Sequence, residues 1–308
     1  MEHLCELQIL DLSRNELREL PASLGHLSKL QHLVVFRNNL AHLPGSLGSL
    51  HSLRSLSAHS NALEDLPSEV GGLNSLELCD LSCNMLLALP NDFSYATALT
   101  RLDLSHNRLQ YLPMDFGQLF SLQASAWVLD LRCNNLASLP TSVSGLKSLQ
   151  VLRAGENEIV EVTDAWGGMD NLVELEAPVN RIGRLAPGIC GMKELQRLDL
   201  CRNRIPDIPL EFGLLTKLHD LNLRSNHLSR LPDEIGALVN LNRLSLAHNR
   251  LEKSLTDYLG LLSHLVDLDL SGNRVTHLPP SLGGLESLLL LNVSKNLLTG
   301  LPQNLTFL

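Results

Sequence analysis

The stretch LQILDLSRNEL at residues 7–17 recurs as LQHLVVFRNNL at 30–40 and as LRSLSAHSNAL at 53–63, which gives a period of 23 residues. An internal period of this size indicates a stacked repeat architecture. The asparagine of the block recurs at positions 15, 38, 61, 84, 107, 134, 157, 180, 203, 226, 249, 273 and 296. The chain therefore contains thirteen repeats. Ten of the twelve intervals are 23 residues, the one from Asn107 to Asn134 is 27, and the one from Asn249 to Asn273 is 24.

The first half of each repeat has the alternation of a short strand. In the first repeat Leu10 and Leu12 point to one side, and Ile9, Asp11 and Ser13 point to the other. We expect the leucines to form the core. Stacked repeats then build a parallel sheet with strands about 4.8 Å apart, and side chains at one repeat position form a column on its outer face.

The second half of each repeat turns the chain back. The asparagine amide both donates and accepts hydrogen bonds, which an aspartate could not do. Ten repeats continue to a proline, and the remainder is short and rich in glycine, as in ASLGHL at 22–27. These segments predict brief helical or 3₁₀ turns on the side opposite the sheet.

The pattern LPxxLGxLxxLxxLxLxxNxL over the whole chain resembles the intracellular leucine-rich repeats of the Ras-suppressor and Scribble/Erbin type. The resemblance implies an α/β fold: a curved horseshoe solenoid of 23-residue repeats, with the parallel sheet on the concave face and 3₁₀ or helical turns on the convex face. It also implies a cytoplasmic scaffold or adaptor whose protein partner is a small GTPase, kinase, phosphatase or polarity protein.

Composition and charge agree with a protein partner. The formal net charge is −9 and no run of lysine or arginine occurs, which argues against nucleic acid and anionic membranes. No secretory leader and no long apolar span is present, so the sequence predicts no membrane insertion. The six cysteines do not form the spaced pairs or clusters that disulfides of secreted proteins require. We therefore expect free thiols in a reducing, cytoplasmic compartment. Sequons at Asn292 and Asn304 are expected by chance in an asparagine-rich repeat.

Catalytic and metal motifs are missing from the sequence, which predicts a protein that is not an enzyme and binds no cofactor or metal. DLDLSGN at 267–273 begins like a calcium loop, but its twelfth position is Leu278 instead of glutamate. Two alternative functions remain open: the regulatory repeat portion of a larger kinase, GTPase or phosphatase, and an extracellular receptor fragment.

Residues 1–308 are predicted to form a single repeat domain that lacks a polar cap at either end, so we expect a fragment or isoform of a longer protein. The insertion ASAW at 124–127 should place Trp127 near solvent. Trp166 aligns with the core residue Leu24 and should be buried.

Two surfaces on the sheet face are candidate partner-binding sites. In repeat two, Phe36 is an aromatic side chain among polar columns, with a basic rim, and resembles a binding hot spot. Three adjacent aspartates farther along should repel one another and attract a basic partner. The residues predicted to bind a partner are Arg14, His32, Val34, Phe36, Arg37, His59, Asp80, Asp103 and Asp130.

Overall fold

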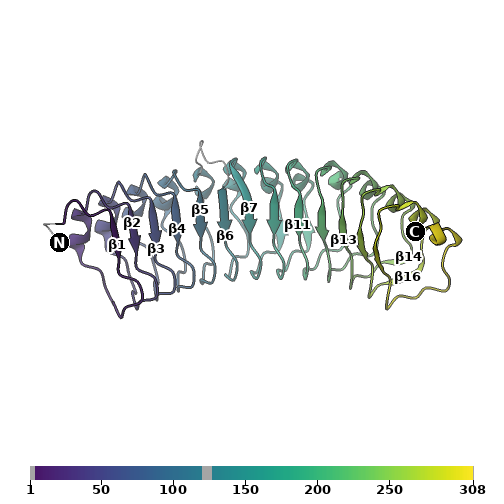
Figure 1. Ribbon diagram of the computed structural model, residues 1–308, viewed down its shortest axis with the longest axis horizontal. Helices are drawn as coiled ribbons and strands as arrows, with labels where there is room; N and C mark the ends of the chain where they lie inside the picture. Colours follow the sequence, from purple (N-terminus) through teal and green to yellow (C-terminus); the bar gives the residue numbers. More distant parts are fainter. Residues whose placement is uncertain (1–3, 120–126, 308) are drawn as a thin grey trace. The chain divides into compact units, whose positions relative to one another are not determined.

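The computed structural model describes residues 4–119 and 127–307, and the chain divides into two compact units, Met1–Glu158 (unit 1) and Ile159–Leu308 (unit 2). Each unit is described by itself. Both consist of short parallel strands lying side by side, with a row of 3₁₀ turns behind them (Figure 1). The prediction of one domain over 1–308 stays a prediction.

Unit 1 forms one parallel sheet in which neighbouring strands come from consecutive repeats. Leu33 in one strand pairs with Leu10 and Leu56 on either side, so equal repeat positions are aligned. In the described part of unit 1 the strands are β1 (Ile9–Asp11), β2 (His32–Val34), β3 (Ser55–Ser57), β4 (Leu78–Asp80), β5 (Arg101–Asp103), β6 (Trp127–Asp130) and β7 (Leu149–Arg153). Its 3₁₀ turns are η1 (Ala22–His26), η2 (Gly45–Ser49), η3 (Ser68–Gly72), η4 (Asn91–Tyr95), η5 (Phe116–Gln118) and η6 (Thr141–Gly145).

Unit 2 repeats the same arrangement and adds two small two-stranded parallel sheets after the asparagines. The strands of its long sheet are β9 (Glu174–Glu176), β11 (Arg197–Asp199), β12 (Asp220–Asn222), β13 (Arg243–Ser245), β15 (Asp267–Asp269) and β17 (Leu290–Asn292). The small sheets pair β8 (Glu161–Val162) with β10 (Arg184–Leu185), and β14 (Glu252–Ser254) with β16 (Arg274–His277). The 3₁₀ turns are η7 (Asp164–Gly168), η8 (Pro187–Gly191), η9 (Leu210–Leu214), η10 (Asp233–Ala237), η11 (Asp257–Leu261), η12 (Pro280–Gly284) and η13 (Gln303–Phe307).

The thirteen predicted repeats and their parallel strands are confirmed, and so is the leucine core. In repeat three Leu53 and Leu63 are fully buried and Leu56 is 3% exposed. Trp166, on the turn side of repeat seven, is also fully buried, as predicted. Among the described residues no helix combines the length and the apolar character that crossing a bilayer requires.

Trp127 corrects a prediction. Its side chain is 1% exposed rather than near solvent. The strand register shifts between Trp127 and Val128, and this shift pairs Trp127 with Leu149, which occupies a core leucine position. The ring therefore takes the place of a core leucine at the start of β6. The preceding three residues of the insertion, 124–126, lie outside the described residues.

Proline and glycine shape the turn side. Pro44, with an extended backbone (φ −69°), directly precedes η2, which suits the fixed φ of proline. Gly48 within η2 lies so close to the next repeat that an added Cβ would be 2.1 Å from the carbonyl oxygen of Glu69. At Gly48 only glycine allows η2 to approach the next repeat this closely.

From Asn38 onward, the ladder asparagines tie neighbouring repeats together. Asn107 donates from Nδ2 to the carbonyl oxygens of Leu81 (3.0 Å) and Leu104 (3.1 Å), and its Oδ1 accepts from the amide of Leu86 (3.0 Å). The two partners Leu81 and Leu86 belong to the preceding repeat. The amide thus satisfies backbone groups that the end of the strand would otherwise leave buried and unpaired.

The residue before each ladder asparagine adopts a left-handed backbone. The φ angles lie between 52° and 57° for the non-glycine residues at this position, and Gly272 has φ 68°. Most L-residues are disfavoured there, and a β-branched one most of all. Val179 (φ 55°) is therefore a strained position in unit 2.

We predict that Asn107→Asp lowers the free energy of unfolding by about 3 kcal/mol or more, because a carboxylate would face two buried carbonyl oxygens with no proton to donate. Chemical denaturation measures the change. Asn135→Asp is the matched control, since Asn135 lies one residue after a ladder asparagine and is exposed. Equal effects in the two variants would contradict the bonding role of the buried amide.

We predict that Val179→Asn raises the free energy of unfolding by about 1 kcal/mol, because asparagine tolerates the left-handed backbone. Val179 is 40% exposed, so little packing is lost. The control Val160→Asn removes a valine that is 51% exposed and has no positive φ, and should give no gain in melting temperature. A loss of stability in Val179→Asn would show that the valine side chain is needed for packing.

Candidate protein-binding surface

The side chains that face away from the core along each sheet form the candidate surface. In β2 the central Leu33 is buried, whereas His32 and Val34 on either side are partly exposed. The same alternation holds in β11 and β12, as the strand period of two residues requires. Because the strands pair in register, outward side chains of successive repeats stand next to one another. This outward-pointing surface of the long sheets is called the sheet face below.

An aromatic cluster lies on the sheet face of unit 1. The rings of Phe36 and His59 stack with centroids 4.6 Å apart and planes 8° from parallel. The guanidinium carbon of Arg14 lies 5.8 Å from the centre of the Phe36 ring, within the range of a cation–π interaction. The structure thus brings together three of the predicted site residues from three successive repeats.

The other predicted residues of repeat two surround this cluster. His32 and Val34 are partly exposed, and Arg37 is exposed. The Arg37 backbone amide donates to the carbonyl oxygen of His59 at 3.0 Å, which fixes the two repeats side by side. His32, Val34 and Arg37 are therefore at least partly accessible to a partner.

The three predicted aspartates differ from one another in the structure. Asp80 and Asp103 each accept hydrogen bonds from the backbone amide and hydroxyl of the serine two residues later, and both remain partly exposed. Asp130 is only 4% exposed, and Arg132 contacts its carboxylate through Nε and, at 2.6 Å, through Nη2.

This pairing changes the expectation for Asp130. Three open, mutually repelling carboxylates were predicted, but Arg132 compensates one of them. The sequence signal was the arginine at 132, where the two preceding repeats have serine. Asp80 and Asp103 remain the acidic groups that a basic partner could reach.

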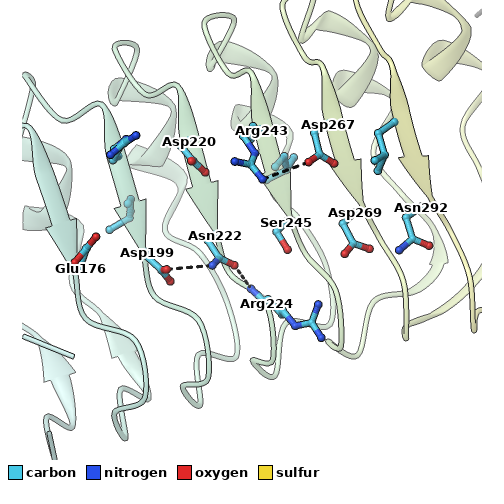
Figure 2. A pocket seen from close by; sticks show the side chains of 14 residues that line it. Glu176, Asp199, Asp220, Asn222, Arg224, Arg243, Ser245, Asp267, Asp269 and Asn292 are labelled. Carbon is cyan, nitrogen blue, oxygen red and sulfur yellow. Dashed lines mark hydrogen bonds and ion pairs between the residues drawn. The ribbon is translucent and has the colours of Figure 1, made fainter. Parts of the chain in front are cut away.

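Unit 2 has a hollow of about 550 Å³ on its sheet face, which the sequence analysis did not single out. Figure 2 shows Glu176, Asp199, Asn222, Ser245, Asp269 and Asn292 in a row across consecutive strands. A second row carries side chains of alternating charge, namely Arg197, Asp220, Arg243 and Asp267. The alternation of Arg and Asp at one repeat position was the sequence signal for this surface.

Side chains from neighbouring strands interact within the hollow. Nη2 of Arg243 lies 3.6 Å from Oδ2 of Asp267, and the Asn222 amide donates to Asp199 Oδ2 at 3.1 Å (Figure 2). Exposed ion pairs of this kind contribute little to stability. Charged groups of both signs therefore remain available to a partner that lies across these strands.

The thiol beside the hollow is not poised for nucleophilic chemistry. Burial and, after it, the neighbouring Asp199 carboxylate raise the pKa of Cys201 to about 11. Burial likewise raises the pKa of Cys133 to about 11 and that of Cys190 to about 12. These thiols are protonated at neutral pH, whereas the thiolate is the reactive form. In the described part of the chain, no three His, Cys, Asp or Glu side chains are grouped to hold a metal ion.

Comparisons with known proteins agree with the repeat pattern. Models of the leucine-rich repeat match residues 5–63, 98–119, 193–251 and 264–285. None of the curated proteins compared with this chain matches it.

Solved structures share the fold along almost the whole chain. A leucine-rich repeat protein of Leptospira interrogans is 33% identical with a TM-score of 0.87, and the alignment covers 99% of this chain and 76% of that one. The ectodomain of the Arabidopsis thaliana receptor kinase GASSHO1/SCHENGEN3, in complex with Casparian strip integrity factor 2, is 26% identical (TM-score 0.58; 98% of this chain, 46% of that one).

The plant peptide hormone receptor RGFR1, in complex with RGF2, is 27% identical with a TM-score of 0.50, and the alignment covers 97% of this chain and 60% of that one. The chain thus spans about half the length of these plant receptor chains. The repeat period, the asparagine ladder and these matches lead to one conclusion: the chain belongs to the leucine-rich repeat proteins.

Proposed function

We propose that this chain is a non-catalytic scaffold or adaptor in intracellular signalling that binds a partner protein on its sheet face. The observation that carries the proposal is the stacked pair of Phe36 and His59 with Arg14 above the ring. Aromatic and arginine side chains dominate the binding energy of protein interfaces. This cluster lies outside the leucine core, so core packing does not account for it.

The partner class follows from the resemblance to repeats of the Ras-suppressor and Scribble/Erbin type. It favours a small GTPase, kinase, phosphatase or polarity protein in the cytoplasm. Cys79, Cys83, Cys133, Cys190 and Cys201 are free thiols, which fits a reducing compartment. Asp80 and Asp103 in unit 1 and the mixed charges of the hollow in unit 2 would supply electrostatic complementarity, which contributes chiefly to specificity and association rate.

A second candidate is an extracellular receptor fragment. It is favoured by the similarity to plant receptor chains solved in complex with RGF2 and Casparian strip integrity factor 2. Exposed Asn304 in an NLT sequon could carry a glycan, whereas Asn292 is partly buried in the lining of the hollow. A partner engaged on the sheet face is common to both candidates.

We predict that Phe36→Ala weakens binding of a partner protein by about 1 to 3 kcal/mol, the cost of losing an interface anchor. The unfolding free energy should fall by only about 1 kcal/mol, the value of one aromatic pair. The partner is first identified by affinity capture and mass spectrometry, and its purified form is then titrated by calorimetry.

Tyr95→Ala is the matched control for this prediction, because Tyr95 is 59% exposed on η4, away from the sheet face. The control should leave binding unchanged. If Phe36→Ala binds like the unmodified chain, the sheet face of repeat two is not the interface. If it strongly lowers the melting temperature, the ring serves the core instead.

We predict that the chain isolated from its native cells carries no glycan at Asn292 or Asn304, as expected of a cytoplasmic protein. Intact mass before and after glycosidase treatment measures this, with Asn304→Gln as the control for the exposed sequon. A glycan on Asn304 would favour the extracellular receptor and reject the cytoplasmic scaffold.

A further inference from the structure

A column of basic side chains runs along unit 2 directly after the asparagine ladder. The residue that follows the ladder asparagine is basic in five consecutive repeats, namely Arg181, Arg204, His227, Arg250 and Arg274. In unit 1 the same position holds Glu16, Asn39, Ala62, Met85, Arg108, Asn135 and Glu158. The column, called the basic edge below, is therefore a property of unit 2 and not of the repeat pattern.

Backbone hydrogen bonds hold the basic edge in register. The amide of Arg204 donates to the carbonyl oxygen of Ile182 at 2.9 Å, and that of Arg250 donates to Leu228 at 2.8 Å. The amides at positions 181, 227 and 274 donate in the same way to the preceding repeat. The side chains of the basic edge consequently start from backbone positions spaced like neighbouring strands, about 4.8 Å apart.

Two arginines in the middle of the basic edge, Arg204 and Arg250, carry uncompensated positive charge. Arg204 and Arg250 are exposed, and neither has an ion pair among the described residues, whereas Arg274 lies 3.2 Å from Glu252. Burial lowers the pKa of His227, which lies between the two arginines, and the charges of Arg250 and then Arg204 lower it further. His227 therefore lies in the positive electrostatic potential of the arginines on both sides.

Further cations flank the column on the same edge. Arg230 and Lys253, three residues beyond His227 and Arg250, are exposed, and Asp207 is the acidic side chain in the equivalent place of the preceding repeat. Like charges this close repel one another in the free protein. A surface that opposes stability in this way is typical of a binding site.

We propose that the basic edge docks an acidic helical segment of a partner protein. A helix with Asp or Glu every three or four residues presents one carboxylate per turn of 5.4 Å, close to the spacing of the basic column. An extended chain would present same-side groups about 6.6 Å apart, a poorer match. The edge lies outside the sheet-face cluster, so this proposal goes beyond the sheet-face function and stands independently of it.

Nucleic acid fits the basic edge less well. The segments from the ladder asparagine to the fourth residue after it contain no Phe, Tyr or Trp in repeats eight to twelve, so no aromatic platform is available for stacking bases. The net charge of −9 also repels a long polyanion. A short acidic segment of a protein encounters less of that repulsion.

The test uses the full chain and two fluorescent alanine-based helical peptides of identical composition. One has its glutamates in a single row along the helix, and the other has them spread around it. Fluorescence anisotropy should show tighter binding of the row peptide, and Arg204→Gln combined with Arg250→Gln should weaken it about tenfold or more. The double variant Lys193→Gln with Lys217→Gln, which removes the same charge elsewhere in unit 2, should change binding less than twofold.

Two further measurements separate this role from a structural one. The melting temperature of Arg204→Gln with Arg250→Gln should rise at low salt, because repulsion is relieved, and the rise should vanish at high salt. Equal binding of both peptides, equal loss in both double variants, or tighter binding of a single-stranded oligonucleotide than of the row peptide would overturn the proposal. Because Phe36 and the sheet face are unchanged in these variants, failure here leaves the sheet-face function intact.

Discussion

The asparagine amide after each strand is the interaction on which the rest of the structure depends. From the second repeat onward, the asparagine binds the preceding repeat. In repeat five, Asn107 donates from Nδ2 to Leu104 of its own repeat and Leu81 of the preceding one, and its Oδ1 accepts from the amide of Leu86. These bonds pair backbone groups inside the molecule where neither a strand nor water can do so. Buried leucines then fill the space that the bonds enclose.

Register is the consequence that matters for function. Because each repeat bonds to the next at equivalent positions, one type of residue at one position becomes a column. Phe36 and His59 stack because both occupy the second position before a ladder asparagine in adjacent repeats. The row of alternating charge in unit 2 and the basic edge arise by the same rule, at two other positions of the repeat.

The two proposed surfaces differ in chemistry and in how much they destabilise the free chain. The Phe36 and His59 rings shield part of each other from water, so their exposure costs little in the free chain. Arg204 and Arg250 repel across His227, and the proposed acidic partner would relieve that repulsion. Neither surface contributes to the leucine core, which explains how each can vary from one repeat to the next.

Period, strand pattern and turn residues were enough to determine the fold, because every repeat must bury the same leucines and bond the same asparagine. The residues around Phe36 could also be placed on one surface from the register alone. Tertiary structure decided the rest: Asp130 is compensated by Arg132, and Trp127 enters the core through an irregularity in β6. Charge compensation and local shifts in register depend on distances between side chains, and a repeat pattern specifies positions without specifying those distances.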